Sequence, residues 1–148
     1  MPEALPATDQ EYADHFKLME EQTQSYLPEV LELMDLSPQA YAELFRARGE
    51  VYTVREADQA AGFYWIELRG RELHLHGIIL KPDFQGHGLG SWILNKLERD
   101  YSEQADFIEL GVHNSNEGAY RLYKRLGYQV VDERPELDFL IMRKALPN

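Results

Sequence analysis

Three glycines at alternate positions, within the stretch IILKPDFQGHGLGSWILNKL (residues 78–97), constrain this chain more than any other feature. The stretch begins with aliphatic residues typical of a buried strand and ends in an apolar repeat typical of a helix. Gly86, Gly88 and Gly90 lie between the two. Because glycine has no Cβ atom, a ligand can approach the main chain, and the N–H groups at a helix start form an anion site. The sequence therefore predicts a strand-to-helix corner that can hold a phosphate.

Three other interpretations of this loop fit less well. The dinucleotide fingerprint GxGxxG is not met because the glycines are spaced GxGxG, although an acidic residue, Glu109, follows about 20 residues further on. A P-loop requires Gly-Lys-Ser/Thr, and Leu89 follows Gly88 instead, which excludes it. A turn that only links two elements would normally need one glycine rather than three.

Helix signals occur along the whole chain. They are a capping box formed by Thr8 and Glu11, a segment at 37–48 that Gly49 ends, the apolar repeat that starts near Leu89, and a segment capped by Asn114 or Ser115 and ended by Gly127. Residues 26–36, which contain Pro28, are expected to form a loop and a helical turn.

Strand signals alternate with these helices. The expected strands are residues 3–7, 51–56, 61–68, 72–80, 107–112, 128–131 and 138–144. A turn at ELRGREL predicts that 61–68 and 72–80 form an antiparallel hairpin. An antiparallel first half with a strand-helix-strand crossover in the middle indicates an α+β (mixed α/β) fold.

Composition limits the classes of partner. The 148 residues suit one domain, residues 1–148, with one core. Acidic residues outnumber basic ones 26 to 15, which disfavours nucleic acid or anionic membrane as partners and suits a cationic one. The absence of cysteine excludes a thiol nucleophile. The N-terminus lacks a secretory signal and no apolar segment approaches the ~20 residues of a membrane span, so we expect a cytoplasmic protein.

Two segments resemble the signatures of the GNAT superfamily of N-acetyltransferases. QGHGLG (85–90) resembles the motif [RQ]xxGx[GA], and NEGAYRLYKRLGY (116–128) resembles the second signature, with Asn, Ala, Leu-Tyr and a closing Gly-aromatic pair. The likeness covers residues 72–128 well and the order of elements over nearly the whole chain. It implies a central mixed, mostly antiparallel twisted sheet of about six to seven strands flanked by about four helices.

The resemblance implies that acetyl-CoA is the cosubstrate and a primary amine the acceptor. It assigns the pyrophosphate to the backbone amides from Gly86 to Ser91, and the pantetheine arm to a slot between the strand before the loop and the strand after the helix. The Leu80 N–H would face the thioester oxygen. The cofactor-binding set implied in this way is Ile78, Ile79, Leu80, Gln85, Gly86, His87, Gly88, Leu89, Gly90, Ser91, Asn116, Ala119 and Tyr123.

The resemblance also suggests catalytic residues. Tyr123 is expected to protonate the departing CoA thiolate, since a phenol with an ordinary pKa near 10 carries its proton at neutral pH; packing in the core is the alternative. His74 and His76 share one strand face and are candidates for the general base, although many family members carry a carboxylate where His74 stands. A water chain ending on Glu72 or in bulk solvent is the other candidate. Two histidines without a third ligand do not predict a metal, and we expect none.

Substrate choice is expected to depend on residues 26–38, on Tyr64 and Trp65, and on residues 132–138. The two loop segments carry the acidic residues Glu29, Glu32, Asp35, Asp132, Glu133, Glu136 and Asp138. These carboxylates could bind a small cationic amine or a peptide amine as the acceptor. The alternative is that they form an acidic rim that only contacts solvent. The identity of the acceptor and the oligomeric state, monomer or homodimer, stay open. The alternative function is a non-catalytic module that binds or senses acetyl-CoA or interacts with a partner.

Overall fold

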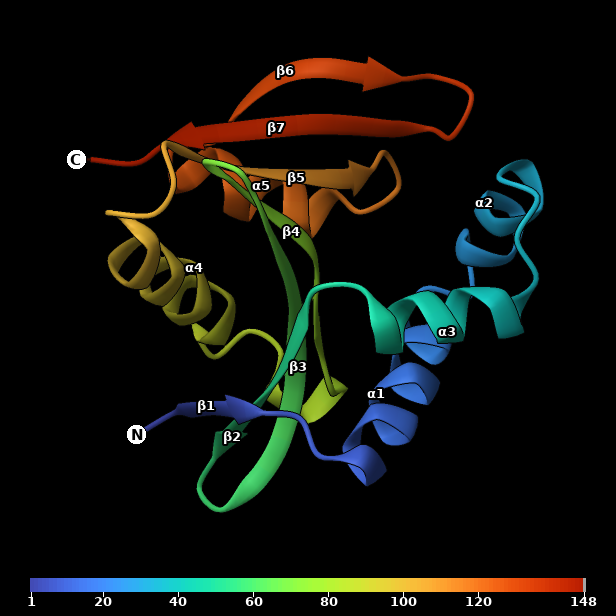
Figure 1. The fold of residues 1–148 in the computed structure, drawn as a ribbon, viewed down its shortest axis with the longest axis horizontal. Coiled ribbons are helices and arrows are strands. Elements are labelled where there is room, and N and C mark those ends of the chain that lie inside the picture. The colour runs from blue at the N-terminus through green and yellow to red at the C-terminus, as the bar shows by residue number, and fades with distance from the viewer. Residues whose placement is uncertain (148) are drawn as a thin grey trace. The chain divides into compact units, whose positions relative to one another are not determined.

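The computed structural model describes residues 1–147, and over these residues the chain forms five α-helices and seven strands (Figure 1). The helices are α1 (Asp9–Gln22), α2 (Leu27–Leu33), α3 (Pro38–Ala47), α4 (Leu89–Tyr101) and α5 (Glu117–Arg125), with one turn of 3₁₀ helix, η1, at Pro82–Phe84. The strands are β1 (Glu3–Pro6), β2 (Glu50–Glu56), β3 (Gln59–Arg69), β4 (Glu72–Leu80), β5 (Phe107–His113), β6 (Gln129–Arg134) and β7 (Phe139–Ala145).

The seven strands form one sheet in the order β1-β2-β3-β4-β5-β7-β6. Strands β4 and β5 are parallel, whereas β1 pairs with β2, and β7 pairs with both β5 and β6, in antiparallel fashion. The expected α+β fold with a mixed, mostly antiparallel sheet is therefore confirmed. One helix more than expected is present, because α2 replaces the predicted loop and helical turn.

The chain divides into two compact units. Unit 1 consists of Met1–Trp65 and Ile78–Gln85, and unit 2 consists of Ile66–Gly77 and the residues from Gly86 onward. Strands β3 and β4 contribute residues to both units. A single domain over residues 1–148 stays a prediction.

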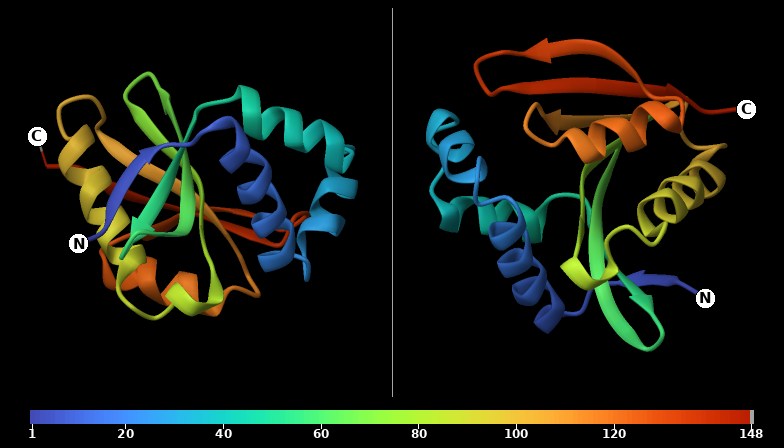
Figure 2. Two further views of the ribbon diagram at one scale, coloured as in Figure 1. Left: turned by 90° about the horizontal axis from the view of Figure 1, so that it is seen from below. Right: turned by 180° about the vertical axis from the view of Figure 1, so that it is seen from behind.

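In unit 1, α1, α2 and α3 lie together on one side of β2 and the first half of β3 (Figure 2). Helix α1 starts with the predicted capping box, in which Thr8 and Glu11 each accept from the other's main-chain N–H. The Ser37 side chain caps α3. An aromatic-rich core joins these helices to the strands, and Phe45, at its centre, is 2% exposed. The buried members of this core are Met19, Phe45, Val51, Phe63 and Trp65.

In unit 2, β5 and β7 pair along the full length of β5, and β6 forms the sheet edge (Figure 1). Leu73 and Leu75 on β4 are buried, as are Ile108 and Leu110 on β5, so one face of these strands is apolar. Because successive side chains point to opposite faces, the residues between them form a polar face. That face carries Glu72, His74 and His76 of β4 and Glu109 of β5.

Helix α4 begins at Leu89 as expected, and its stripe of Leu89, Ile93, Leu94 and Leu97 is buried. Helix α5 ends before Gly127, whose φ is 99°, also as expected. The cap differs from the expectation of Asn114 or Ser115, because it is the side chain of Asn116 that accepts the Ala119 N–H. None of the helices formed by the described residues has the length and apolar character of a membrane span.

Candidate active site

The glycine corner of unit 2 has an open backbone. Gly86 and Gly88 have φ values of 77° and 84°, and a Cβ atom at either position would have no atom within 4 Å. Gly88 is the N-cap of α4 and offers no capping side chain, and the first turn of the helix contains no acidic residue. The N–H groups of Leu89, Gly90 and Ser91 in that turn lack partners within the helix, so the corner offers converging donors to an anion.

Gly90 differs from the other two glycines in its surroundings. A Cβ atom at this position would lie 2.9 Å from Cδ2 of Leu122 on α5, at the end of a flexible side chain. The role of Gly90 in the cofactor site stays a prediction. Two further members of the predicted cofactor-binding set lie at this corner. The side chain of His87 is exposed, and that of Ser91 is half-buried.

The unit 1 members of the predicted set are Ile78, Ile79, Leu80 and Gln85. The aliphatic residues, at the end of β4, are half-buried. Gln85 Nε2 donates to the carbonyl oxygen of Leu80 and to Oε1 of Gln22, both at 2.9 Å. Gln85 thus fixes the loop that follows the strand, a structural role that the motif alone does not reveal.

Gly62 on β3 is a residue that sequence reasoning missed. A Cβ atom there would lie 2.1 Å from the carbonyl oxygen of Ile79 and 2.8 Å from Cα of Leu80. Only glycine allows β3 to approach β4 so closely at this point. A glycine inside a strand pattern is the signal that could have identified it.

Helix α5 carries the other predicted residues. Asn116 Oδ1 accepts from the Ala119 N–H at 3.2 Å, so this side chain acts as a helix cap. Ala119 is half-buried. Tyr123 is 8% exposed, and its ring lies 5.9 Å from that of Tyr128. This position is compatible with packing and with proton donation, and the catalytic role of Tyr123 stays a prediction.

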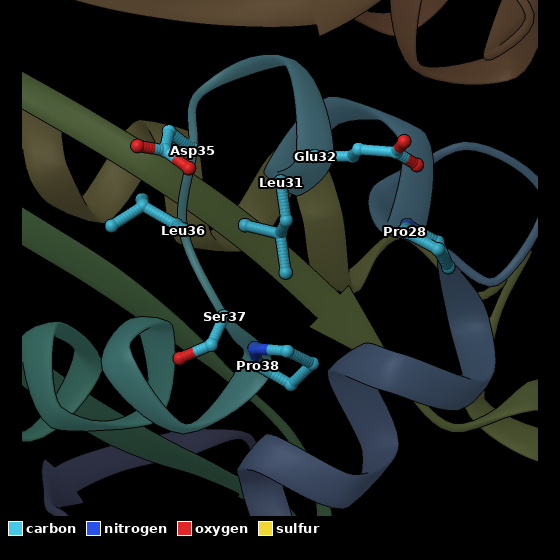
Figure 3. A pocket seen from close by; sticks show the side chains of 7 residues that line it. All are labelled: Pro28, Leu31, Glu32, Asp35, Leu36, Ser37 and Pro38. Carbon is cyan, nitrogen blue, oxygen red and sulfur yellow. The ribbon is translucent and has the colours of Figure 1, made fainter.

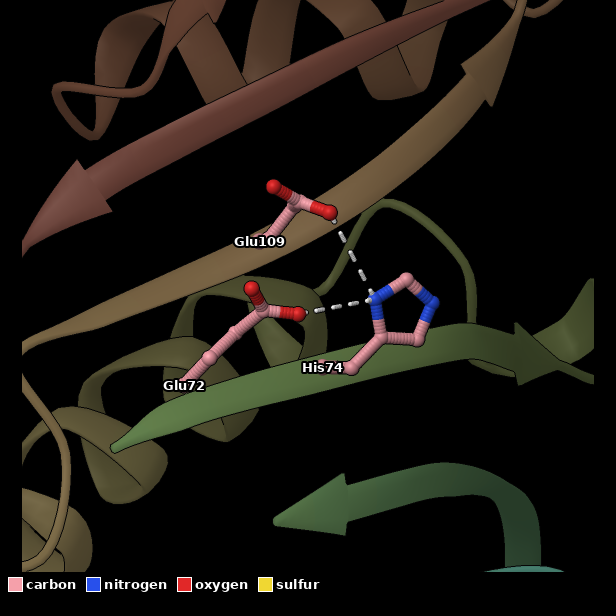
Figure 4. A group of neighbouring side chains, drawn as sticks. All are labelled: Glu72, His74 and Glu109. Atoms are coloured by element: carbon pink, nitrogen blue, oxygen red, sulfur yellow. Dashed lines mark ion pairs between the residues drawn. The ribbon is translucent and has the colours of Figure 1, made fainter. Parts of the chain in front are cut away.

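The two predicted histidines lie together on the polar face of unit 2. The rings of His74 and His76 are 4.5 Å apart and nearly perpendicular. His74 Nδ1 lies 3.9 Å from Glu72 Oε2 and 3.9 Å from Glu109 Oε1, and both carboxylates point toward the His74 ring (Figure 4). Burial, together with the charges of His76 and Arg69, lowers the pKa of His74 to about 4, so this ring is neutral at pH 7.

The donor atoms of Glu72, His74 and Glu109 lie within 4.8 Å of one another, which is close enough to share a cation. Arg143 already supplies positive charge here, since its Nε lies 2.6 Å from Glu109 Oε2 and its Nη2 lies 3.9 Å from Glu72 Oε1. We therefore assign the group as a charge-compensated cluster. Three of its members are register neighbours on adjacent strands, in the pairs His74↔Glu109 and Glu109↔Arg143, and Glu72 lies two residues before His74 on β4.

A cavity of about 350 Å³ lies in unit 1 at the predicted substrate segment (Figure 3). Two carboxylates, Glu32 and Asp35, contribute to its lining. The lining residues are Pro28, Leu31, Glu32, Asp35, Leu36, Ser37 and Pro38. In contrast, the side chains of Tyr64 and Trp65 are 2% and 3% exposed, so neither offers a surface to an acceptor, contrary to expectation.

Solved structures share the fold of this chain. The structure matches the ribosomal-protein-S18-alanine N-acetyltransferase of Escherichia coli with a TM-score of 0.75 and 19% identity, over 99% of this chain and 94% of that one. It also matches the PaiA N-acetyltransferase of Thermoplasma acidophilum, solved in complex with coenzyme A, with a TM-score of 0.75 and 16% identity over 98% and 99% of the two chains. The fold is that of the N-acetyltransferases.

The sequence identifies the family. Residues 14–128 match the model of the acetyltransferase (GNAT) family, so the chain belongs to this family and is an acyl-CoA-dependent N-acyltransferase. It is 31% identical over 112 residues to an uncharacterized N-acetyltransferase of Bacillus subtilis, YvbK, covering 74% of this chain and 72% of that protein. It is 35% identical over 72 residues to the thialysine N-epsilon-acetyltransferase of Bos taurus, covering 48% and 42%.

Proposed function

We propose that the protein transfers the acetyl group of acetyl-CoA to a small cationic primary amine or a peptide amine, by direct attack in a ternary complex. The open backbone of Gly86 and Gly88 at the start of α4 is the observation that carries this proposal. Its converging N–H groups suit the pyrophosphate of CoA. Ile78, Ile79 and Leu80 are proposed to contact the pantetheine arm, and the remaining members of the predicted set complete the cofactor site.

The chemistry needs three proton transfers. An alkylammonium must lose a proton before its nitrogen can attack, and His76 or His74 is proposed to take that proton. The new C–N bond forms as the C–S bond breaks, and the CoA thiolate takes a proton from Tyr123. The attacking nitrogen loses a second proton, which replaces the one that Tyr123 gave. One proton per turnover therefore reaches the solvent by way of the base.

The acceptor is proposed to be cationic for two reasons. The chain carries a formal charge of −11, which attracts cations over a distance. The cavity of unit 1 contains Glu32 and Asp35 among mainly apolar neighbours. Such a lining suits an ammonium group attached to a short carbon chain.

Release of the free CoA thiol, measured against a panel of amines, tests the proposal. The panel should contain a polyamine, an aminoglycoside, free amino acids and peptides with a free N-terminus, with neutral hydroxyl analogues as controls. We expect thiol release with at least one amine and none with its hydroxyl analogue. Binding of acetyl-CoA, measured by calorimetry, without thiol release for any amine would instead support the non-catalytic module.

Other expectations stay predictions at this point. They are a cytoplasmic location, independence from metals, the absence of nucleic acid and membrane as partners, and a monomeric or homodimeric state. Thiol release that is unchanged after treatment with EDTA would support metal independence, as expected for direct attack by a neutral amine.

A further inference from the structure

His76 is paired with a carboxylate that the sequence did not single out. Its Nε2 lies 3.0 Å from Oε1 of Glu67, so β3 and β4 are joined through these two side chains within unit 2. Both are largely shielded, with side chains 15% and 24% exposed. Arg69 Nη2 contacts the same Glu67 oxygen at 3.0 Å and holds the carboxylate in place from its own strand.

This pairing determines which nitrogen of His76 carries the proton in the neutral ring. The hydrogen bonds from Arg69 and His76 lower the pKa of Glu67 to about 2, so its carboxylate is ionised at neutral pH and can only accept. Nε2 of His76 must therefore donate. In the neutral imidazole the lone pair then resides on Nδ1, which makes Nδ1 the atom that can take up a proton.

The neighbouring histidine lacks this support. His74 Nδ1 is buried and forms no hydrogen bond with the described residues, and its carboxylate neighbours are 3.9 Å away. Burial holds the pKa of His74 near 4, which makes it a weak base at neutral pH. Of the two candidates, His76 is the one whose protonated form has a carboxylate in hydrogen-bonding contact.

We propose that Glu67 is a positioning residue that fixes His76 as the general base for the acceptor amine. This inference rests on the proposed acetyl transfer. Glu67 holds Nε2 as the donor and stabilises the imidazolium that forms when His76 Nδ1 takes a proton from the substrate ammonium. The imidazolium then returns that proton to solvent, so the pair is restored after each turnover.

The charges around His76 set the direction of the expected pH effect. Glu67 favours the protonated ring, whereas Arg69 of β3 and any charge on His74 disfavour it. Glu72, Glu109 and Arg143 surround His74 on the same face. Removing only the Glu67 charge leaves the cation of Arg69 close by, so the pKa of His76 should fall.

The test is Glu67→Gln, which keeps the size of the side chain and removes its charge. Titration of the histidine ring by NMR, with the His76 signals assigned from His76→Asn, should show the pKa of His76 falling by about one unit. The acidic limb of the pH profile of kcat/KM should move to lower pH by the same amount. KM for acetyl-CoA should stay constant. An unmoved His76 titration together with an unmoved limb would overturn the inference.

Two further variants separate positioning from general damage to the fold. Asp106→Asn breaks another ion pair, that with Arg71 at 3.0 Å, and should change neither the His76 titration nor the limb. Adding Glu67→Gln to His76→Asn should cost no further activity, because Glu67 acts through His76; additive losses would contradict this. If no amine supports thiol release by the wild type, the proposed function fails, and the His76 titration alone then decides whether the pair exists.

Discussion

At the scale of single residues, Tyr123 combines a buried ring with a dissociable proton. Its ring is 8% exposed and lies beside Tyr128, so either a structural or a catalytic role would keep the aromatic ring. The phenolic proton alone distinguishes these roles. A phenol with an ordinary pKa near 10 carries its proton at neutral pH and can give it to the departing thiolate while the attacking nitrogen supplies the replacement.

Tyr123→Phe removes that proton and keeps the ring. We expect kcat to fall about 100-fold or more, because an alkylthiolate would leave without a proton donor, while KM for acetyl-CoA changes little. Steady-state kinetics of thiol release measures both constants. Tyr120→Phe, on the same helix, is the matched control and should retain the wild-type kcat. An unchanged kcat in Tyr123→Phe would remove this residue from the mechanism.

At the scale of elements, the local patterns of the sequence predicted most of the fold. The strand 72–80 was predicted with the bounds that β4 has, and α4 starts where the glycine loop ends. These predictions succeeded because hydrophobic periodicity, glycine and capping residues act over a few neighbouring positions. The helix in segment 26–36 was harder to predict, because a proline usually breaks a helix. Proline also fits the first turn of a helix, and Pro28 lies in the first turn of α2.

The partners of the site residues could not be predicted in this way. Glu67 meets His76, and Arg143 meets Glu109, because the sheet places their strands in a particular register. The turn at ELRGREL predicts that β3 lies beside β4, but it does not indicate that the side chain of Glu67 meets that of His76. Nothing within a few residues of Arg143 indicates that β5 will lie beside its strand. Local pattern therefore identified the glycine corner and the histidines, whereas the contacts that tune the histidines needed the structure.

The glycine corner gives a prediction about cofactor binding. Gly88→Asn keeps the left-handed backbone, which asparagine tolerates, and places a side chain over the open amides. We expect the affinity for acetyl-CoA, measured by calorimetry, to fall about ten-fold, which corresponds to about 1.4 kcal/mol. Gly70→Asn makes the same change at another left-handed, open position, in the β3–β4 turn, and should leave the affinity unchanged. Equal affinities in wild type and Gly88→Asn would contradict a diphosphate site at this corner.

The close approach of β3 to β4 gives a prediction about stability. In Gly62→Ala, the added Cβ atom meets the backbone of Ile79 and Leu80, which cannot move aside as a flexible side chain could. We expect the free energy of unfolding, measured by urea denaturation, to fall by about 1–3 kcal/mol. Gly77→Ala adds the same atom on β4 where nothing lies within 4 Å, and should have little effect. Similar losses in the two variants would show that the contact does not limit stability.

At the scale of the whole molecule, stability should depend on pH through the neutral, buried His74. Its pKa is about 4 in the folded chain and 6.5 ordinarily, so below pH 6.5 the unfolded chain binds a proton that the folded chain excludes. The free energy of unfolding should therefore fall, by up to about 3 kcal/mol, as the pH drops from about 6.5 to about 4. Burial lowers the pKa of His15 too and adds to the same trend. Urea denaturation between pH 4 and 7.5 should give a shallower dependence for His74→Asn than for the wild type. Parallel curves would show that His74 titrates alike in both states.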